Sequence, residues 1–435
     1  MFALGMVYWL YNRTLDFTNN FFETKFKKTP ALVEANKKVL HEGYNYAETT
    51  EVLSFSYKIS PAKIEKGTYR NINGNTATAW GMIAASEKAG LQLFCGSYPI
   101  TPATEILIEL SKRKDLGVKT FQAEDEIAGI TSAIGASYAG DLAVTTTSGP
   151  GMALKTEAIG LAIITELPLV IVNVQRGGPS TGMPTKMEQS DLLQAVHGRN
   201  SDAPIPVIAA QDPADCFDCA FEAARVAMKY MTPVILLTDG YLGQGSGPWK
   251  IPDPKKLPKI EVSHPDSSAI GEDGFMPYAR DENETRPWAI PGTPGLEHRI
   301  GGLEKENLTG MVSQDPENHQ VMTDIRARKV ENITQDIPPS EIHGDTKGKV
   351  LVLGWGSTHG AIHVAVERAR AKGQSVSQLH LRWVSPFPSD LKTVCDGFDE
   401  ILIPEVNSGQ LALLLKAELI RPIHQLNIVR GEPFR

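Results

Sequence analysis

The stretch QAEDEIAGITSAIGASYAG (Gln122–Gly140) decides the fold of this 435-residue chain. Three acids, ending at Glu126, open a helix that is made almost wholly of small residues. Carboxylates are favoured at a helix N-terminus by the helix dipole and the free N–H groups, and small side chains let another backbone come close. A strand is predicted next at DLAVTTTS (141–148), followed by a GPG turn (149–151) into a further helix. The sequence therefore predicts a carboxylate at a buried, close-packed edge of the fold.

Helices and strands alternate on both sides of this stretch. Apolar runs such as PLVIVNV (168–174) suit strands that are buried on both faces. Repeated alternation of this kind predicts an α/β fold with a doubly wound parallel sheet. The expected strands lie near residues 91–95, 119–123, 141–147, 168–175, 205–209 and 233–238, and the expected helices near 77–89, 103–113, 126–139, 151–165 and 212–230.

The chain divides into five parts by composition. The doubly wound unit occupies residues 71–243, and a smaller α/β unit occupies 346–435. Residues 244–345 between them are rich in Pro, Gly and charge, which predicts an extended connecting segment with a function or a wrapping role. Residues 1–45 are expected to be mostly helical, and 46–70 to be a polar linker. In the smaller unit, strands are expected at 349–354, 376–381 and 400–404, and helices at 358–372, 389–396 and 409–420.

Composition excludes several classes of protein. The net charge of −8 argues against a nucleic-acid surface. Four cysteines in this length argue against a disulfide framework and fit a reducing compartment. No run reaches the roughly 18 apolar residues that a membrane span needs. We therefore expect a cytoplasmic protein that binds neither nucleic acid nor membrane.

Two further segments place chemically useful side chains at strand ends. Thr101 lies in YPITP (98–102), where prolines stiffen the backbone and present a hydroxyl at the edge where ligands of parallel sheets bind. Arg176 lies in VQRGGPSTGMPT (174–185), directly after a buried strand, and a guanidinium is the natural planar partner of a carboxylate. Alternatively, the first segment is a plain proline-rich turn and the arginine pairs with a surface acid.

Together with PEVNSGQ (404–410), these segments occur in the order found in one family. The chain resembles the alpha subunit of a 2-oxoacid:ferredoxin oxidoreductase, most closely the 2-oxoglutarate type. The resemblance implies a thiamine-diphosphate pyrimidine-binding domain followed by a transketolase C-terminal-like domain, which is expected to be truncated. It also implies that residues 1–45 are the last helices of a fused gamma domain, so that the sequence is a fragment of a longer chain. A short natural extension is the alternative.

The resemblance assigns roles to individual residues. Glu126 corresponds to the glutamate that shares a proton with the cofactor pyrimidine, and burial favours such sharing by raising the pKa of a carboxyl. Without the resemblance, Glu126 would be a helix-capping acid. The family threonine that contacts the substrate carboxylate matches Thr101, and the arginine that binds the 2-oxo acid matches Arg176. The remaining expected site residues are Thr185 and Lys186 for the substrate and Tyr98, Pro99 and Ile100 for the cofactor.

The rest of the catalytic centre is expected on a partner. The sequence has no Gly-Asp-Gly motif followed by an asparagine, which the family uses to hold Mg²⁺ and the diphosphate. CFDC (216–219) lies within a predicted helix and has no second cysteine pair, so no metal site is expected here. The resemblance implies a beta subunit that supplies Mg²⁺ and a [4Fe-4S] cluster, in a dimer of heterodimers. Glu405, Asn407 and Gln410 are expected to have a packing or subunit-contact role.

The predicted activity is therefore the oxidative decarboxylation of a 2-oxo acid. Thiamine diphosphate, shared with the partner, would supply the carbanion chemistry, coenzyme A would accept the acyl group, and ferredoxin would accept the electrons. Two alternatives remain open at this stage. One is a pyruvate or branched-chain 2-oxoacid oxidoreductase, and the other is a non-catalytic scaffold subunit.

Overall fold

Strands of the main sheet form where apolar residues face two separate cores. All residues of β5 (Leu169–Gln175) are buried. Val170 and Val172 pack into one hydrophobic cluster, whereas Leu169 and Ile171 pack into the other. A strand that is apolar on both sides is typical of a parallel sheet covered by two helical layers. The predicted doubly wound architecture is confirmed.

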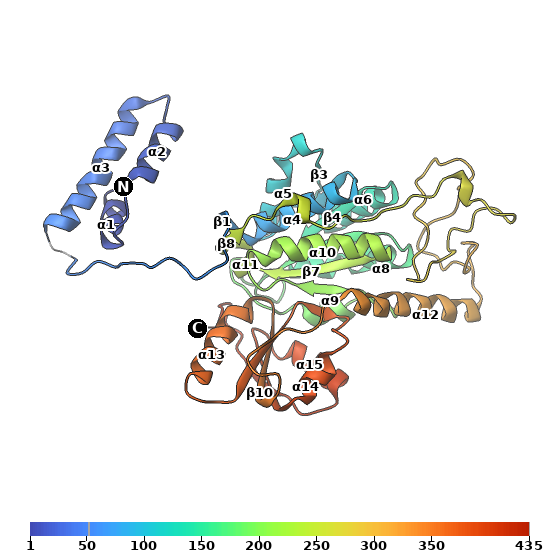
Figure 1. Ribbon diagram of the computed structural model, residues 1–435. Coiled ribbons are helices and arrows are strands. Elements are labelled where there is room, and N and C mark those ends of the chain that lie inside the picture. The colour runs from blue at the N-terminus through green and yellow to red at the C-terminus, as the bar shows by residue number, and fades with distance from the viewer. Residues whose placement is uncertain (51–52, 435) are drawn as a thin grey trace. The chain divides into compact units, whose positions relative to one another are not determined.

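The main sheet has the strand order β12-β6-β7-β5-β4-β2-β3, and every neighbouring pair is parallel except β12 with β6. Figure 1 shows helix α10 alongside strand β7 of this sheet. Helices α4, α5 and α10 pack on one face, and α6, α7 and α8 pack on the other. The elements are α4 (Gly74–Ala89), β2 (Leu93–Ser97), α5 (Thr104–Ser111), η1 (Lys114–Leu116), β3 (Lys119–Gln122), α6 (Glu126–Tyr138), β4 (Leu142–Thr147), α7 (Gly149–Leu154), α8 (Thr156–Ile164), α9 (Leu192–His197), β6 (Val207–Ala209), α10 (Asp215–Tyr230), β7 (Pro233–Asp239) and α11 (Gly240–Gln244).

Two features of this sheet differ from the sequence-based expectation. The helix expected at 151–165 is divided into α7 and α8, which meet at Lys155. The edge strand β12 (Trp383–Ser385) was not predicted, and it comes from the smaller α/β unit. It pairs antiparallel with β6, so that Trp383 lies opposite Ile208. The second unit therefore contributes a strand to the sheet of the first.

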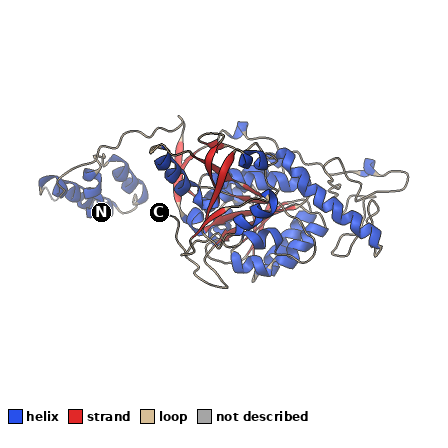
Figure 2. Ribbon diagram, turned by 90° about the horizontal axis from the view of Figure 1, so that it is seen from below, coloured by secondary structure: helices blue, strands red, loops and turns tan. Residues whose placement is uncertain are grey.

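The smaller unit has its own five-stranded sheet, in the order β14-β13-β10-β11-β9. Figure 2 shows the strands of the chain in red and the helices in blue. The three predicted strands of the smaller unit are present and mutually parallel, and two short edge strands, β9 and β14, were not predicted. The elements are β9 (Ile342–His343), β10 (Gly348–Trp355), η5 (Gly356–Thr358), α13 (His359–Arg370), β11 (Val376–Leu381), α14 (Leu391–Asp396), β13 (Phe398–Glu405), α15 (Gln410–Leu419) and β14 (His424–Asn427).

The segment between the units is only partly extended. The expectation of an extended segment at 244–345 is wrong for α12 (Pro316–Asn332), a 17-residue helix. Glu166, at the end of α8, forms buried ion pairs with Lys329 of α12 and with Arg280. Burial alone would raise the pKa of Glu166, but the two cations offset this effect and lower the pKa to about 2. The other elements here are β8 (Ser246–Lys250), which pairs with β1 (Tyr69–Asn73), and η2 (Pro254–Lys256), η3 (Ser267–Ala269) and η4 (Ile333–Asp336).

The computed structural model describes residues 1–50 and 53–434. It separates into a small unit up to Gly67 and the large unit described above. The small unit contains α1 (Phe2–Leu10), α2 (Asp16–Lys25) and α3 (Pro30–Thr49), so its last helix extends into the stretch that was expected to be a linker. Its assignment to a gamma domain stays a prediction. Among the described residues, no helix is both long and apolar enough to cross a membrane.

Candidate active site

Glu126 is held at the first turn of α6. The neighbouring Asp125 is the N-cap residue, and its Oδ1 accepts a hydrogen bond from the N–H of Ala128 at 2.8 Å. Because Asp125 caps the helix, Glu126 is not needed for that purpose. The side chain of Glu126 is half-buried. The cap of α6 is therefore Asp125 rather than Glu126, and the catalytic role of Glu126 stays a prediction.

Tyr98 and Thr147 close the space beside this carboxylate. They follow or end the neighbouring strands β2 and β4, and their hydroxyl oxygens lie 2.9 Å apart. A Cβ atom on Gly151, in the first turn of α7, would overlap both hydroxyl groups and lie 3.0 Å from Cγ of Glu126. Burial raises the pKa of Tyr98, and the nearby Glu126 raises it further. The absence of a side chain at Gly151 thus lets α7 pack directly against Tyr98, Thr147 and Glu126.

Replacing Gly151 with alanine is expected to destabilise the protein. Overlap with Tyr98 and Thr147 should cost about 1–3 kcal/mol, as is usual when a close-packed site is overfilled. Gly135, in α6, has open space at its Cβ position and is the matched control. Its replacement by alanine should stabilise the helix by about 0.5–1 kcal/mol. The midpoint of thermal unfolding measures both, and an unchanged midpoint for Gly151→Ala would contradict the packing argument.

A buried lysine lies directly beneath the same cluster. Lys155 is fully buried, and its Nζ donates to the backbone carbonyl of Glu126 at 2.7 Å and to Oγ1 of Thr145 at 3.1 Å. The same Nζ lies 5.1 Å from the ring centroid of Tyr98. Sequence reasoning missed this residue, although Lys155 is the one charged residue in the run 142–156. Its contacts fix the backbone that carries Glu126.

Lys155 should make stability depend on pH in the alkaline range. Burial lowers its pKa to about 8, and Glu126 offsets part of that effect. Below pH 8 the lysine is protonated in both the folded and the unfolded chain, so the cost of its buried charge is fully present. Between about pH 8 and 10 the folded protein releases the proton while the unfolded chain keeps it, so stability rises with pH by up to about 3 kcal/mol. The thermal midpoints of the wild type and of Lys155→Met are compared at pH 7 and 9.5. Between these pH values, the midpoint of the wild type should rise relative to that of Lys155→Met.

Arg176 and Thr101 meet at the same edge of the sheet. Arg176 follows β5 and is 6% exposed, and its Nη1 donates to the main-chain carbonyl of Thr101 at 2.7 Å. Its buried Nε has no hydrogen-bond partner in the described part of the chain. The Thr101 side chain itself is exposed. The two residues predicted from separate segments are therefore neighbours, with a guanidinium that retains donor capacity.

The chain after Arg176 folds back on itself. The N–H of Gly177 donates to the carbonyl of Lys186 at 2.9 Å, and the N–H of Met183 donates to the carbonyl of Gly177 at 2.8 Å. This closes a loop that brings the exposed residues Thr185 and Lys186 back to the end of β5. The predicted substrate residues thus share one short segment beside Arg176.

The other predicted cofactor residues lie between Tyr98 and the helix α5. Pro99 is exposed and Ile100 is half-buried. The backbone N–H of Ile100 donates to Oγ1 of Thr104 at 2.7 Å, which fixes the turn between β2 and α5. The side chains of Pro99 and Ile100 have no hydrogen-bonding group, so they can contribute only apolar surface at this edge of the sheet.

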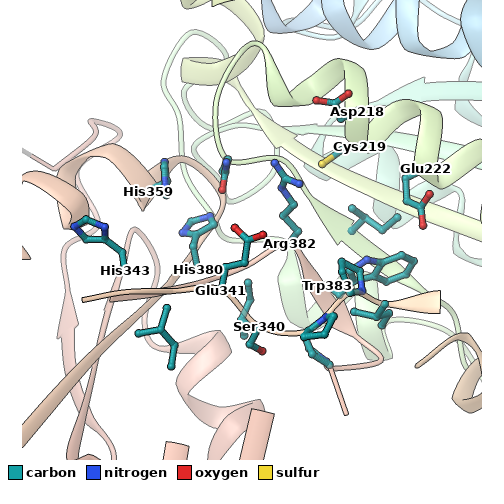
Figure 3. Close-up of a pocket in the computed structure, with 18 of the residues that line it drawn as sticks. Asp218, Cys219, Glu222, Ser340, Glu341, His343, His359, His380, Arg382 and Trp383 are labelled. Carbon is teal, nitrogen blue, oxygen red and sulfur yellow. The ribbon is translucent and has the colours of Figure 1, made fainter. Parts of the chain in front are cut away.

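A cavity of about 880 Å³ lies elsewhere in the large unit, between α10, α13 and the end of β11 (Figure 3). None of the predicted site residues is among the described residues that line it. Both arginines of its lining are already in ion pairs, Arg225 with Glu222 and Asp336, and Arg382 with Asp215. Burial lowers the pKa of the lining residue His380. Among the described residues that line this cavity, no arginine is therefore left unpaired for the carboxylate of a 2-oxo acid.

Cys216 and Cys219 lie on α10 and not in the segments that carry Glu126 and Arg176. Both thiols are buried within α10, and burial raises the pKa of each. A buried thiol with a raised pKa is a poor metal ligand because the thiolate is the binding form. Among residues 1–50 and 53–434, no group of three His, Cys, Asp or Glu side chains is arranged to hold a metal ion.

Two family models match the two α/β units. The model described as "Pyruvate flavodoxin/ferredoxin oxidoreductase, thiamine diP-bdg" matches residues 85–315. The model described as "Pyruvate:ferredoxin oxidoreductase core domain II" matches residues 348–431. The order of the two matches is that of the two sheets.

Curated relatives match most or all of the chain. The chain is 50% identical to the 2-oxoglutarate oxidoreductase subunit KorA of Mycobacterium tuberculosis, over 100% of this chain and 66% of that protein. It is 32% identical to the 2-oxoacid:ferredoxin oxidoreductase 2 subunit alpha of Aeropyrum pernix, over 86% and 61%. For the 2-oxoglutarate synthase subunit KorA of Methanothermobacter marburgensis the identity is 32%, over 78% and 88%. The chain thus spans less than two thirds of the length of the first two relatives.

A solved structure agrees with these matches. The 2-oxoglutarate:ferredoxin oxidoreductase from Magnetococcus marinus, with 2-oxoglutarate, coenzyme A and succinyl-CoA bound, superimposes with a TM-score of 0.91 at 34% identity. The match covers 100% of this chain and 74% of that chain. The chain belongs to the 2-oxoacid:ferredoxin oxidoreductase family and corresponds to its alpha subunits.

Proposed function

We propose that this chain is the alpha part of a 2-oxoglutarate:ferredoxin oxidoreductase. In the proposed reaction, 2-oxoglutarate, coenzyme A and two oxidised ferredoxins give succinyl-CoA, carbon dioxide, two reduced ferredoxins and a proton. The cleaved C1–C2 bond leaves an electron pair, and the two ferredoxins take up these electrons. The observation that carries the proposal is the convergence of Glu126, Tyr98 and Arg176 at one sheet edge, in a chain 50% identical to a 2-oxoglutarate oxidoreductase subunit.

The edge around Glu126 fits the pyrimidine side of thiamine diphosphate. A half-buried carboxylate that is not used as a helix cap can hold a proton at a ring nitrogen. Gly151 lets α7 pack closely beside this carboxylate, and Lys155 donates a hydrogen bond to the backbone carbonyl of Glu126. When bound, the cofactor would supply the carbanion that attacks the keto carbon. Tyr98, Pro99 and Ile100 would border its ring.

Charge in the loop after β5 favours a substrate with two carboxylates. We assign the carboxylate next to the keto group to Arg176 and Thr101, and the distal carboxylate to Lys186 and Thr185. Exposed Lys186 lies in the loop that returns to the end of β5, beside Arg176. Pyruvate and branched-chain oxo acids have no second carboxylate, so a cation at 186 would give them no advantage. They remain the alternative substrates, because the matching family model is described for pyruvate.

The partners belong to the same proposal. We propose a beta subunit that carries Mg²⁺, the diphosphate site and a [4Fe-4S] cluster, assembled with this chain as a dimer of heterodimers in the cytoplasm. Ferredoxin would be the electron acceptor. The active site would then lie between the subunits, with thiamine diphosphate shared by both.

Substrate profiling of the assembled enzyme tests the proposal. The full-length chain is co-expressed with its beta partner, and coenzyme A-dependent viologen reduction is measured with 2-oxoglutarate, pyruvate and branched-chain oxo acids. We expect 2-oxoglutarate to have the highest kcat/KM. A preference for pyruvate or a branched-chain acid would keep the mechanism and overturn the substrate. Inactivity with every oxo acid, in a folded complex that contains thiamine diphosphate, would favour the scaffold alternative.

A further inference from the structure

The loop that carries the proposed substrate residues is anchored by the smaller α/β unit. We call residues 176–191 the substrate loop, which begins at the end of β5 and ends before α9. Its first half is closed by the bonds between Gly177, Met183 and Lys186. Its second half is buried, with Glu188 5% exposed and Gln189 fully buried. Glu188 holds the start of the loop by accepting a hydrogen bond from the N–H of Gly178 at 3.2 Å.

Gln189 connects the loop to the second sheet through all of its polar atoms. Its Nε2 donates to the carbonyl of Trp355 at 2.7 Å, at the end of β10. Its Oε1 accepts from the N–H of Val406 at 3.1 Å, and its own N–H donates to the carbonyl of Val406 at 3.1 Å. Its carbonyl accepts from Nδ2 of Asn407 at 2.8 Å. Buried amides that are fully paired in this way fix a single geometry.

Glu405 organises the surface that receives Gln189. This fully buried carboxylate accepts hydrogen bonds from Trp355 Nε1 at 3.1 Å, Asn407 Nδ2 at 2.9 Å and the N–H groups of Leu411 and Ala412 at 2.9 and 3.1 Å. These bonds join the ends of β10 and β13 to the first turn of α15. The receiving surface is therefore held together by hydrogen bonds within the smaller unit, in addition to those that it makes with the loop.

Gln410 provides a second attachment just beyond Gln189. Its Nε2 donates to the carbonyl of Ser190 at 2.7 Å, and its Oε1 accepts from the N–H of Leu193 at 3.0 Å. The loop end is thus attached at consecutive residues to the segment PEVNSGQ, which the sequence singled out without giving it a chemical task. The C-terminal segment also contacts the loop, since a Cβ on Gly431 would lie 2.9 Å from Cβ of Lys186.

We propose that the smaller α/β unit sets the geometry of the substrate loop, with Gln189 as the positioning residue and Gln410 as its support. Arg176 is fixed by β5, whereas Thr185 and Lys186 lie between the bond from Gly177 to Lys186 on one side and the attached half of the loop on the other. Their separation from Arg176, and therefore the length of oxo acid that fits, depends on this attachment. The expected effect on substrate binding rests on the proposed function. The attachment of the loop to the smaller unit does not.

Gln189→Ala in the full-length chain, assembled with its beta partner, tests the proposal. Hydrogen exchange of the Gly177, Met183 and Lys186 amides should become at least roughly tenfold faster, because the loop closure loses its fixed end. The KM for 2-oxoglutarate should rise about 10- to 100-fold with a much smaller change in kcat, as expected when binding geometry rather than chemistry is altered. Gln410→Ala should give a weaker form of both effects, and it keeps the test usable if Gln189→Ala does not fold.

Gln378→Ala is the matched control. Gln378, like Gln189, is a buried glutamine, but it lies in β11 of the smaller unit and its Nε2 donates to the carbonyl of His359. Gln378→Ala should leave the hydrogen exchange of the loop amides and the KM for 2-oxoglutarate unchanged. Equal effects in Gln378→Ala, or unchanged loop exchange in Gln189→Ala, would overturn the proposal. So would faster exchange with an unchanged KM, since the loop would then not position substrate. If the wild-type complex turns over no oxo acid, the proposed function fails, and hydrogen exchange still decides whether the attachment exists.

Discussion

Replacing Glu126 with glutamine is expected to lower kcat for 2-oxoglutarate-dependent viologen reduction by about 10³-fold or more, since one positioned proton-transfer group contributes roughly 10²- to 10⁴-fold. The amide has nearly the shape of the carboxyl group, but it cannot exchange a proton with a ring nitrogen. Asp125 would still cap α6, so the helix should form normally. The measurement is steady-state viologen reduction by the full-length chain with its beta partner.

Glu124→Gln is the matched control for this prediction. Glu124 lies two residues earlier in the same acidic cluster, and its side chain is exposed. It should have wild-type kcat, and both variants should keep the wild-type thermal midpoint to within a few degrees. Near-normal turnover by Glu126→Gln, or an equal loss in Glu124→Gln, would show that position 126 does not carry the proton chemistry.

Arg176→Lys is expected to raise the KM for 2-oxoglutarate about 10- to 100-fold, because a charge-assisted hydrogen bond contributes about 1.5–3 kcal/mol. Lysine keeps the positive charge, but it cannot bond to the Thr101 carbonyl and present a planar pair of donors to a carboxylate at the same time. The change in kcat should be smaller, and pyruvate and 2-oxoglutarate should be affected alike, since both carry the carboxylate next to the keto group.

Arg199→Lys separates this effect from the general loss of a partly buried arginine. Arg199 donates to the main-chain carbonyls of Ala195, Val196 and Ala203 at 2.6–3.1 Å, after α9 and away from the sheet edge. We expect it to lower the thermal midpoint without raising KM. A KM for Arg176→Lys equal to that of Arg199→Lys would remove Arg176 from the substrate site.

The main sheet could be predicted because its signals are local. In β4, β5 and β7 every residue is buried, and each strand begins with an uninterrupted apolar run (LAV, LVIV and PVILL) before its polar end. The start of α6 followed equally from local chemistry, since an acidic cluster before a run of small residues marks a helix start, whereas the choice of Glu126 within that cluster came from the family resemblance. The meeting of Arg176 with Thr101 followed because parallel strands end at one edge.

Helix α12 could not be recognised from apolar periodicity, because its buried side contains charges. Arg326 is 8% exposed and Lys329 is 2% exposed, and they are compensated by Glu304 and Glu166 from distant parts of the chain. A start signal was nevertheless present in DPE (315–317), where Asp315 caps the helix and a proline occupies its first turn.

Long-range partners account for the other omissions. β12 is three residues long and is a strand only because β6 lies beside it. Gln189 is an ordinary polar residue until Val406 and Trp355 are brought to it. From the sequence alone, Lys155 would be taken for a solvent-exposed helix residue, because its contact with Thr145 of β4 cannot be seen there. In each case the feature depends on a contact with a residue outside the local sequence, so no local pattern predicts it.

The strand that β12 adds to the main sheet has a consequence for protein engineering. The N–H of Ala209 donates to the carbonyl of Arg382 at 2.7 Å, and Arg382 also pairs with Asp215 at 2.6 Å. Cutting the chain between the two α/β units would leave β6 as an open edge, which invites aggregation. The units are therefore not interchangeable modules. A chimera that takes its C-terminal part from a relative would have to match that part's edge strand to β6, or exchange both units together.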